Sequence, residues 1–540
     1  MPRRTMIVRA PGLGVRLGLF IALLLAAGAH AQLAPREVLV VYDSRIADSR
    51  LVAEHYAGSA KVPGGVGGVA PARPGVRVVD LASLGAPAPT GATLSYANFK
   101  TRLRDPIANY LRDENLTRAV RSLVLTKGIA HRVQDIASAN VGDAPASAAN
   151  LYLQGNATYA SVDSELTLVL QTLDDGESGG SGDSFADGNI VNPYHRSNEQ
   201  IAAFSRAAAG EPIRLIPVIP GQIWRGALPA GGAPAGLTPG QMLLVSRLDG
   251  HTVDDVRAMI DRAQHVVLDP GSSAIVLDES GSNGVADAGP NNELDNRGIS
   301  IIRAGDDYEM TRDHLLADGR WNPAMIRYDE ASGASRFLVG PRLDYNNEGL
   351  LVEDPVVLLA HYGSNHAGAK PGGTAGRTYP ESFHYAPGAV FNTIESYNAR
   401  AFNGLGSTLG QAQAADFLAA GGTFAIGHVW EPFADFIPDN DFLVRNFLLG
   451  HLSWAEAAWT SIPVLSWQHV VLGDPLARVV RTSEDLNGDG RVDIDDLYEW
   501  YRLGGVDINN DGVIDEADKQ LLIEAIRFGE TLEQRESARP

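Results

Sequence analysis

The stretch Asp485-Leu-Asn-Gly-Asp-Gly-Arg-Val-Asp-Ile-Asp-Asp496, with its near repeat Asp507-Ile-Asn-Asn-Asp-Gly-Val-Ile-Asp-Glu-Ala-Asp518, decides the fold of the C-terminal end of the chain. Oxygen-bearing side chains stand at positions 1, 3, 5, 9 and 12 of each stretch, and a glycine stands at position 6. Such side chains can converge on one hard cation, while the glycine permits the sharp turn between them. Because an apolar helical segment follows each copy, the repeat predicts two calcium loops; the alternative is a solvated acidic linker.

The predicted calcium ligands follow one plan in both loops. Each loop supplies five side chains and, at position 7, one backbone carbonyl. Eleven acidic residues between 485 and 518 would repel one another without a counter-ion, so we expect this small segment to be largely disordered without calcium. The predicted ligands are Asp485, Asn487, Asp489, Arg491, Asp493 and Asp496 for the first ion, and Asp507, Asn509, Asp511, Val513, Asp515 and Asp518 for the second.

Position 12 distinguishes these loops from the usual EF-hand loop, which has a bidentate glutamate there. Both loops carry the shorter aspartate instead, and they follow one another closely. In these respects the segment 481–530 resembles a type I dockerin. The resemblance implies a small all-α, EF-hand-like module and a cohesin-like or other protein partner, which dockerins bind through positions 10 and 11. Those positions hold Ile494-Asp495 and Glu516-Ala517 here, in place of the small hydroxylated residues frequent in dockerins. Residues 531–540 are expected to form a tail.

The N-terminal residues 1–31 have the pattern of a secretory signal peptide. Four arginines precede the apolar run Leu17 to Ala27, and Ala29-His30-Ala31 is a small-x-small cleavage site. The run is too short for a transmembrane helix, and no later segment has the roughly 20 apolar residues that a span requires. We therefore expect a secreted, periplasmic or cell-surface protein, cleaved near Ala31, with general secretion or twin-arginine export left open.

Composition narrows the classes of partner. The chain has no cysteine, so disulfides, thiolate metal sites and a thiol nucleophile are excluded. Bound calcium would then stabilise the small exported module in place of disulfides. The formal net charge is −21, and neither half of the sequence carries a basic patch. A nucleic acid or an anionic membrane surface is therefore not expected as a partner.

The body between these ends, residues 32–480, alternates short apolar runs with helical patterns. Such alternation predicts an α/β fold with a mainly parallel sheet, in one domain or two subdomains. Segments rich in Gly, Pro, Ala or Ser near 174–188 and 227–240 are predicted to be loop insertions. The strand predictions that matter below are Glu37 to Tyr42, Ser122 to Thr126, Met242 to Ser246, Ser273 to Leu277, Val356 to Ala360, Ala389 to Ile394 and Thr423 to Ile426.

Several segments of the body resemble an uncharacterised family of exported bacterial proteins from genomes with the exosortase sorting system. The resemblance spans roughly residues 36 to 480. It implies a role in envelope or extracellular-polymer biology and carries no functional residues with it. The segments are Thr126-Lys-Gly-Ile129, Ser161-Val-Asp-Ser-Glu-Leu166, Asn192-Pro-Tyr194, Ser246-Arg-Leu-Asp-Gly250 and Gly473-Asp-Pro-Leu476.

A remoter similarity concerns catalysis. Val356 to Ala360 runs into His361, and a later strand runs into Glu395-Ser396, much as strands deliver a catalytic His and Cys in gingipain-like peptidases of the caspase-type fold. With a serine in place of the thiol, the resemblance implies Ser396 as nucleophile and His361 as general base, oriented by Glu395 or Asn365. The alternatives are a degenerate binding cleft and histidines that merely cap a loop.

Other polar residues are candidates for metal, catalytic or ligand-binding sites. His361, His366 and His384 could form a transition-metal site. Asp163 and Glu165 point to the same side of the chain if their segment is extended, and they could then act as paired carboxylates in acid-base catalysis. The alternative is that they anchor a loop. The segment Gly427 to Pro432, with His428 and Glu431, should share the sheet edge of His361. Core packing explains Trp454, Trp459 and Trp467 better than a sugar-stacking platform does.

These patterns leave three functional classes. The preferred class is an exported calcium-binding protein whose C-terminal module mediates attachment. The second is a hydrolase, peptidase-like or polysaccharide-degrading, that uses His361 with Ser396. The third is a purely structural envelope protein. Substrate and oligomeric state are not encoded in any motif of this sequence.

Overall fold

The computed structural model describes residues 33–135, 158–171, 190–206, 238–279, 308–331, 336–345, 350–367, 378–402, 411–432, 436–509 and 512–537. The predicted signal peptide and the predicted insertion at 174–188 lie outside these ranges, as do residues 227–237 of the second insertion and the predicted ligand Asp511. Within the described residues no helix is both long and apolar enough to cross a membrane.

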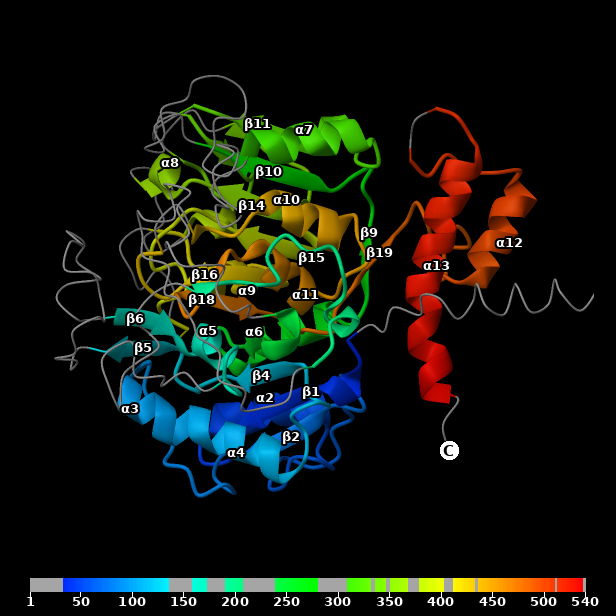
Figure 1. Ribbon diagram of the computed structural model, residues 1–540. Helices are drawn as coiled ribbons and strands as arrows, with labels where there is room; N and C mark the ends of the chain where they lie inside the picture. Colours follow the sequence, from blue (N-terminus) through cyan, green and yellow to red (C-terminus); the bar gives the residue numbers. More distant parts are fainter. Residues whose placement is uncertain are drawn as a thin grey trace, which may run out of the picture.

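A ten-stranded sheet forms the centre of the body (Figure 1). It consists of two five-stranded parallel halves, and the halves meet where β16 pairs antiparallel with β18. The prediction of an α/β body with a mainly parallel sheet is confirmed. In spatial order the strands are β11 (Ile326–Asp329), β10 (Ala274–Asp278), β14 (Val356–His361), β15 (Tyr385–Asn392), β16 (Phe424–His428), β18 (His469–Leu472), β8 (Leu244–Leu248), β4 (Ser122–Thr126), β1 (Val38–Tyr42) and β2 (Arg77–Asp80).

The central strands are apolar along their whole length because both faces of the sheet are covered. All five residues of β1 and all six of β14 are buried. Strands buried on both faces favour continuous runs of Val, Ile and Leu over strict alternation. Buried apolar side chains of both halves join in one continuous core. The three tryptophans Trp454, Trp459 and Trp467 are buried, as core packing requires.

Helices pack against the two halves of the sheet. For example, α2 packs on β1 and β4, α9 on β16, α11 on β8, and α7 on β10 and β11. One continuous helical stretch, from Tyr96 to Asp113, has a π-helical segment at its centre. The helices are α2 (Ala47–Ala57), α3 (Tyr96–Phe99), π-helical η2 (Lys100–Arg104), α4 (Asp105–Asp113), α5 (Val162–Leu166), α6 (Val253–Arg262), α7 (Tyr308–Asp318), α8 (Gly363–Ala367), α9 (Ala414–Ala419), α10 (Asn440–Leu443), π-helical η9 (Val444–Leu448) and α11 (Trp454–Ser461).

Smaller sheets and short 3-10 turns complete the body. The three-stranded sheet holds β3 (Thr93–Ser95), β5 (Arg132–Asp135) and β6 (Thr158–Ser161). The two-stranded pairs are β12 (Leu338–Val339) with β13 (Leu350–Leu351), β7 (Ile190–Val191) with β17 (Val464–Leu465), and β9 (Val266–Leu268) with β19 (Val479–Arg481). The 3-10 turns are η1 (Pro35–Glu37), η3 (Ile201–Ala203), η5 (Pro239–Gln241), η6 (Pro323–Met325) and η7 (Tyr379–Ser382).

The C-terminal segment has a small apolar core of its own. Two helices, α12 (Ile494–Leu503) and α13 (Glu516–Ser537), begin at position 10 of the two predicted calcium loops and stand beside the body in Figure 1. Their core contains Val492, Ile508, Leu522, Ala525 and Ile526 and is separate from the core of the body. Helix α13 continues to Ser537, so most of the predicted tail is helical. The parallel pairing of β19 with β9 leads the chain from the body into this segment.

Candidate functional site

Buried polar residues gather at one edge of the second half of the sheet. Because β10, β14, β15 and β16 are parallel neighbours, their carboxyl ends reach the same edge. Asp278, His361 and His428 end three of these strands, and Glu395 follows the fourth. All four residues are buried. The expected shared edge of His361 and His428 is therefore observed, at the place where α/β sheets usually bind ligands.

Two histidines and one carboxylate converge at this edge. The Nε2 atom of His366 lies 2.8 Å from Oε1 of Glu395, and Nε2 of His361 lies 3.5 Å from Oε2 of the same carboxylate. One potential ligand atom from each residue falls within 4.8 Å of the others. Two imidazoles and one carboxylate form a donor set that suits divalent transition metals.

His361 lacks the hydrogen bonds that a buried imidazole normally makes. Within the described part of the chain, neither ring nitrogen has a hydrogen bond of ordinary geometry, although the residue is fully buried. Burial, reinforced by neighbouring His366, lowers the pKa of His361 well below its usual value. A buried polar group left without a partner costs about 1–3 kcal/mol. The lowered pKa favours the neutral form of the ring, and Nε2 of that ring faces Oε2 of Glu395 at 3.5 Å.

The carboxylate of Glu395 is held in place from several sides. Thr393 donates a hydrogen bond to its Oε2 atom at 3.0 Å, and the backbone N–H of Ala412 donates to Oε1 at 2.8 Å. Asn398 in turn donates to the hydroxyl of Thr393. A Cβ atom at Gly363 would lie 2.3 Å from Cγ of Glu395, so only glycine allows this close approach.

The two imidazole rings are fixed by an aromatic neighbour. The ring of Tyr379 stacks on His366 with centroids 4.2 Å apart and meets His361 edge-on at 4.6 Å. Its hydroxyl donates to the carbonyl of Leu338. Tyr379 therefore restricts the orientation of both histidine rings.

Of the residues predicted to act with His361, one contacts it and the others have different partners. Glu395 contacts His361, as one of the two predicted orienting residues, whereas Asn365 donates to Asp278 at 2.7 Å. Ser396 Oγ donates to Glu431, and among the described residues no hydrogen bond joins Ser396 to His361. The predicted nucleophile and base therefore lie on adjacent strand ends with different partners.

The predicted third metal ligand, His384, lies elsewhere. It is exposed and stands just before β15 begins, at the opposite end of that strand from Glu395. Its carbonyl accepts a hydrogen bond from the N–H of Val356, the first residue of β14. Glu395 occupies the third place in the cluster, and the cue was present in the sequence, because a glutamate directly after a buried strand lies at the edge where strand ends meet.

A second pair of buried histidines adjoins the cluster. The rings of His428 and His469 lie 5.3 Å apart, and Nδ1 of His428 is 3.2 Å from the carbonyl oxygen of Glu395. Burial and the neighbouring His469 lower the pKa of His428 well below its usual value, and burial lowers the pKa of His469 to about 4. Nε2 of His469 contacts the carbonyl of Phe436 at 2.7 Å.

Asp163 and Glu165 are structural anchors. They lie on helix α5, so they do not share the single side that an extended segment would give them. Asp163 makes a fully buried ion pair with Arg247 at 2.7 Å. Glu165 accepts a hydrogen bond from Ser466 at 2.6 Å, and burial raises the pKa of Glu165 to about 7. The paired-carboxylate interpretation has no geometric support.

The first predicted calcium loop is closed by its own carboxylates. Asp485 accepts hydrogen bonds from the N–H groups of Gly488, Asp489 and Gly490. At position 12, Asp496 is buried and accepts from Leu486 and Asn487 through Oδ1 and from Asp493 through Oδ2. Gly490 has a φ of 84°, as the predicted turn at position 6 requires.

The second loop repeats this arrangement position by position. Asp518 is buried and accepts from Ile508 and Asn509 through Oδ1 and from Asp515 through Oδ2. Gly512, with a φ of 83°, donates to Asp507 Oδ2 at 2.8 Å, as Gly490 donates to Asp485. Backbone N–H groups therefore orient these carboxylates, whose oxygens are ligands of the kind that calcium takes.

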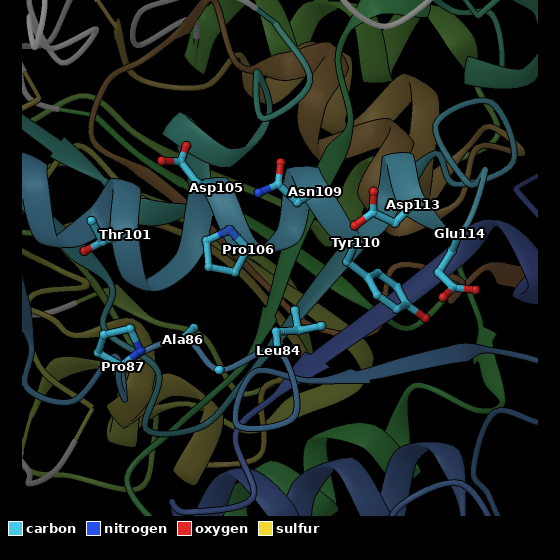
Figure 2. Close-up of a pocket in the computed structure, with 11 residues that line it drawn as sticks. Leu84, Ala86, Pro87, Thr101, Asp105, Pro106, Asn109, Tyr110, Asp113 and Glu114 are labelled. Atoms are coloured by element: carbon cyan, nitrogen blue, oxygen red, sulfur yellow. The ribbon is translucent and has the colours of Figure 1, made fainter.

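Two surface pockets lie away from the cluster. One of about 620 Å³ is open and lies between the loop after β2 and one side of α4, with Asp105, Asn109 and Asp113 on its helical wall (Figure 2). The other, of about 330 Å³, lies between the body and the C-terminal segment and includes Arg320 and Asp507. Neither pocket contains a histidine of the sheet edge.

Comparisons with known proteins do not identify a family for this chain. No protein-family model matches the chain. Searches of curated proteins and of solved structures likewise give no match.

Proposed function

We propose that the chain is an exported calcium-binding protein whose C-terminal segment folds around two calcium ions and attaches the α/β body to another protein. The observation that carries this proposal is the repeated hydrogen-bond pattern of the two loops. In both, the aspartate at position 12 accepts from positions 2, 3 and 9, and the glycine at position 6 donates to position 1. A solvated acidic linker has no reason to repeat such a pattern.

An exposed apolar face supports the attachment role. Ile494, Tyr498 and Tyr501 follow one another at helical spacing on α12, and their exposed fractions are 42%, 66% and 60%. Val513 and Ile514, within the second loop, are also more than half exposed. Contiguous exposed apolar side chains mark protein interaction sites. A partner of the cohesin type, or another protein with an apolar surface, fits this face.

Hydrogen exchange on the mature chain tests the calcium-dependent fold. Backbone amides of residues 481–530 should be protected in calcium and exchange freely with a chelator, while the body is unaffected. Asp518→Ala removes a predicted ligand and should abolish the protection of α13, whereas Glu516→Ala, two positions earlier, should retain it. Equal exchange in calcium and in chelator would contradict the proposal.

A hydrolase using His361 and Ser396 is the second candidate, supported by their place on adjacent strand ends and by two carboxylates beside them. Glu395 lies next to His361, and the hydroxyl of Ser396 donates a hydrogen bond to the carboxylate of Glu431. A carboxylate acceptor can serve a nucleophilic hydroxyl as general base. Labelling by a serine-reactive fluorophosphonate that is lost in Ser396→Ala would favour this candidate, and identical labelling of both proteins would refute it.

A further inference from the structure

We infer that His361, His366 and Glu395 bind one divalent transition-metal cation of the zinc class, at a site separate from the two calcium loops. The three side chains come from the ends of two adjacent parallel strands and from helix α8, which begins two residues after His361. This site goes beyond the proposed function, because neither calcium binding nor attachment uses it.

The spacing of the donor atoms fits such a cation. In a tetrahedral zinc site with bonds near 2.0–2.1 Å, ligand atoms lie about 3.3 Å from one another. The Glu395 oxygens lie 2.8 and 3.5 Å from the two histidine Nε2 atoms, which brackets that value. The donor atoms of the full set lie within 4.8 Å of one another, so the widest separation would have to shorten by about 1.5 Å around an ion.

The unfilled hydrogen-bonding capacity of His361 is an independent sign of a missing ligand. The side chain is fully buried, neither ring nitrogen has a hydrogen bond of ordinary geometry in the described part of the chain, and one of them faces Glu395. Buried polar groups are almost always paired. A cation between the three residues would satisfy this imidazole and neutralise the buried carboxylate at once.

The surroundings of the ligands match those of metal sites in general. Ligating groups are normally oriented by outer hydrogen bonds and by packing. Here Thr393 and the N–H of Ala412 orient Glu395, and Tyr379 stacks on His366. Three protein ligands leave one tetrahedral position for water or a substrate atom, which distinguishes catalytic from closed structural zinc sites.

The donor types separate this site from the calcium loops. Calcium takes six to eight oxygen ligands, whereas imidazole nitrogens favour zinc, copper, iron or nickel. The test should therefore use a metal that reports nitrogen coordination. Cobalt(II) is such a probe, because its visible absorption depends on coordination geometry and on nitrogen ligands.

The experiment titrates the mature chain, stripped of metal and then saturated with calcium, with zinc and with cobalt(II). We expect one equivalent of zinc to bind by calorimetry and cobalt(II) to give a tetrahedral-type spectrum that zinc displaces. His366→Ala and Glu395→Gln should weaken zinc binding by at least about 100-fold, beyond the usual loss for an outer-shell residue. The matched control His384→Ala, at the opposite end of β15, should bind as the wild type does.

Two results would overturn the inference. One is a wild-type chain that binds no zinc once the calcium loops are filled, which is independent of how any variant folds. The other is undiminished stoichiometric binding in a folded His366→Ala chain, with folding checked by its circular dichroism.

Discussion

Replacing Glu165 should change how the stability of the body depends on pH. This side chain is 2% exposed and accepts a hydrogen bond from Ser466. Burial raises the pKa of Glu165 from 4.5 to about 7, while the hydrogen bond from Ser466 and the charge of Arg104 oppose that rise. The body therefore folds with a glutamate that holds its proton more tightly than the unfolded chain does.

The direction in which stability changes with pH follows from the protons that each state binds. Between pH 4.5 and about 7 the unfolded chain has released the proton of this carboxyl group and the folded chain has kept it. The unfolded state is therefore increasingly favoured as pH rises through this window. One pKa unit corresponds to 1.36 kcal/mol, so Glu165 should lower the free energy of unfolding by about 3 kcal/mol by pH 8, relative to pH 4.

The assay is urea unfolding of the mature chain at pH 4, 6 and 8. Glu165→Gln keeps an oxygen acceptor for Ser466 but has no proton to release. The free energy of unfolding of this variant, relative to that of the wild type, should therefore rise by about 3 kcal/mol from pH 4 to pH 8. Glu114→Gln, at an exposed position, is the matched control and should show no such growth. A constant difference between Glu165→Gln and the wild type at all three values would refute the reasoning.

Three further substitutions test a close contact in the cluster, a buried ion pair and the turn of the first calcium loop. Gly363→Ala would place a methyl group 2.3 Å from Cγ of Glu395 and should lower the free energy of unfolding by about 1–3 kcal/mol in urea melts, so an unchanged midpoint would contradict the close approach. Asp163→Asn leaves the buried charge of Arg247 with only the longer contact to Asp249, at 3.6 Å, and should cost about 3 kcal/mol in the same assay, whereas a loss below about 1 kcal/mol would contradict the importance of the Asp163 pair. Gly490→Ala places a residue with a side chain at a φ of 84° and should weaken calcium binding in the first loop about tenfold. Calorimetry measures this affinity, and an affinity equal to that of the wild type would show that the loop does not need glycine at this turn.

Much of the body could be predicted because its strands are local apolar runs. The run from Val356 became β14 almost residue for residue, and Ser122 to Thr126 is β4 without change. Strand order could not be predicted, because the antiparallel contact between β16 and β18 joins segments far apart in the sequence. Strand β18 itself, only four residues long, gives too short an apolar run to be recognised.

The cluster was predicted in part. His361 and His366 lie together as expected, whereas His384 does not join them. The strand expected from Ala389 to Ile394 begins earlier, at Tyr385, and has an irregular register against β14 and a φ of 77° at Gly388. His384 therefore stands at the start of the strand. A local pattern could not reveal this, since the irregularity depends on the neighbouring strand.

The number of calcium ions bound by the mature chain tests the central claim most directly. Equilibrium dialysis against calcium, with metal analysis of the protein, should give two ions per chain. With free calcium at 100 times the dissociation constant, each ion would stabilise the folded segment by about 2.7 kcal/mol. Asp518→Ala should leave one ion, and the same change combined with Asp496→Ala should leave none. A wild-type chain that binds no calcium, or a double variant that still binds two ions, would contradict the account.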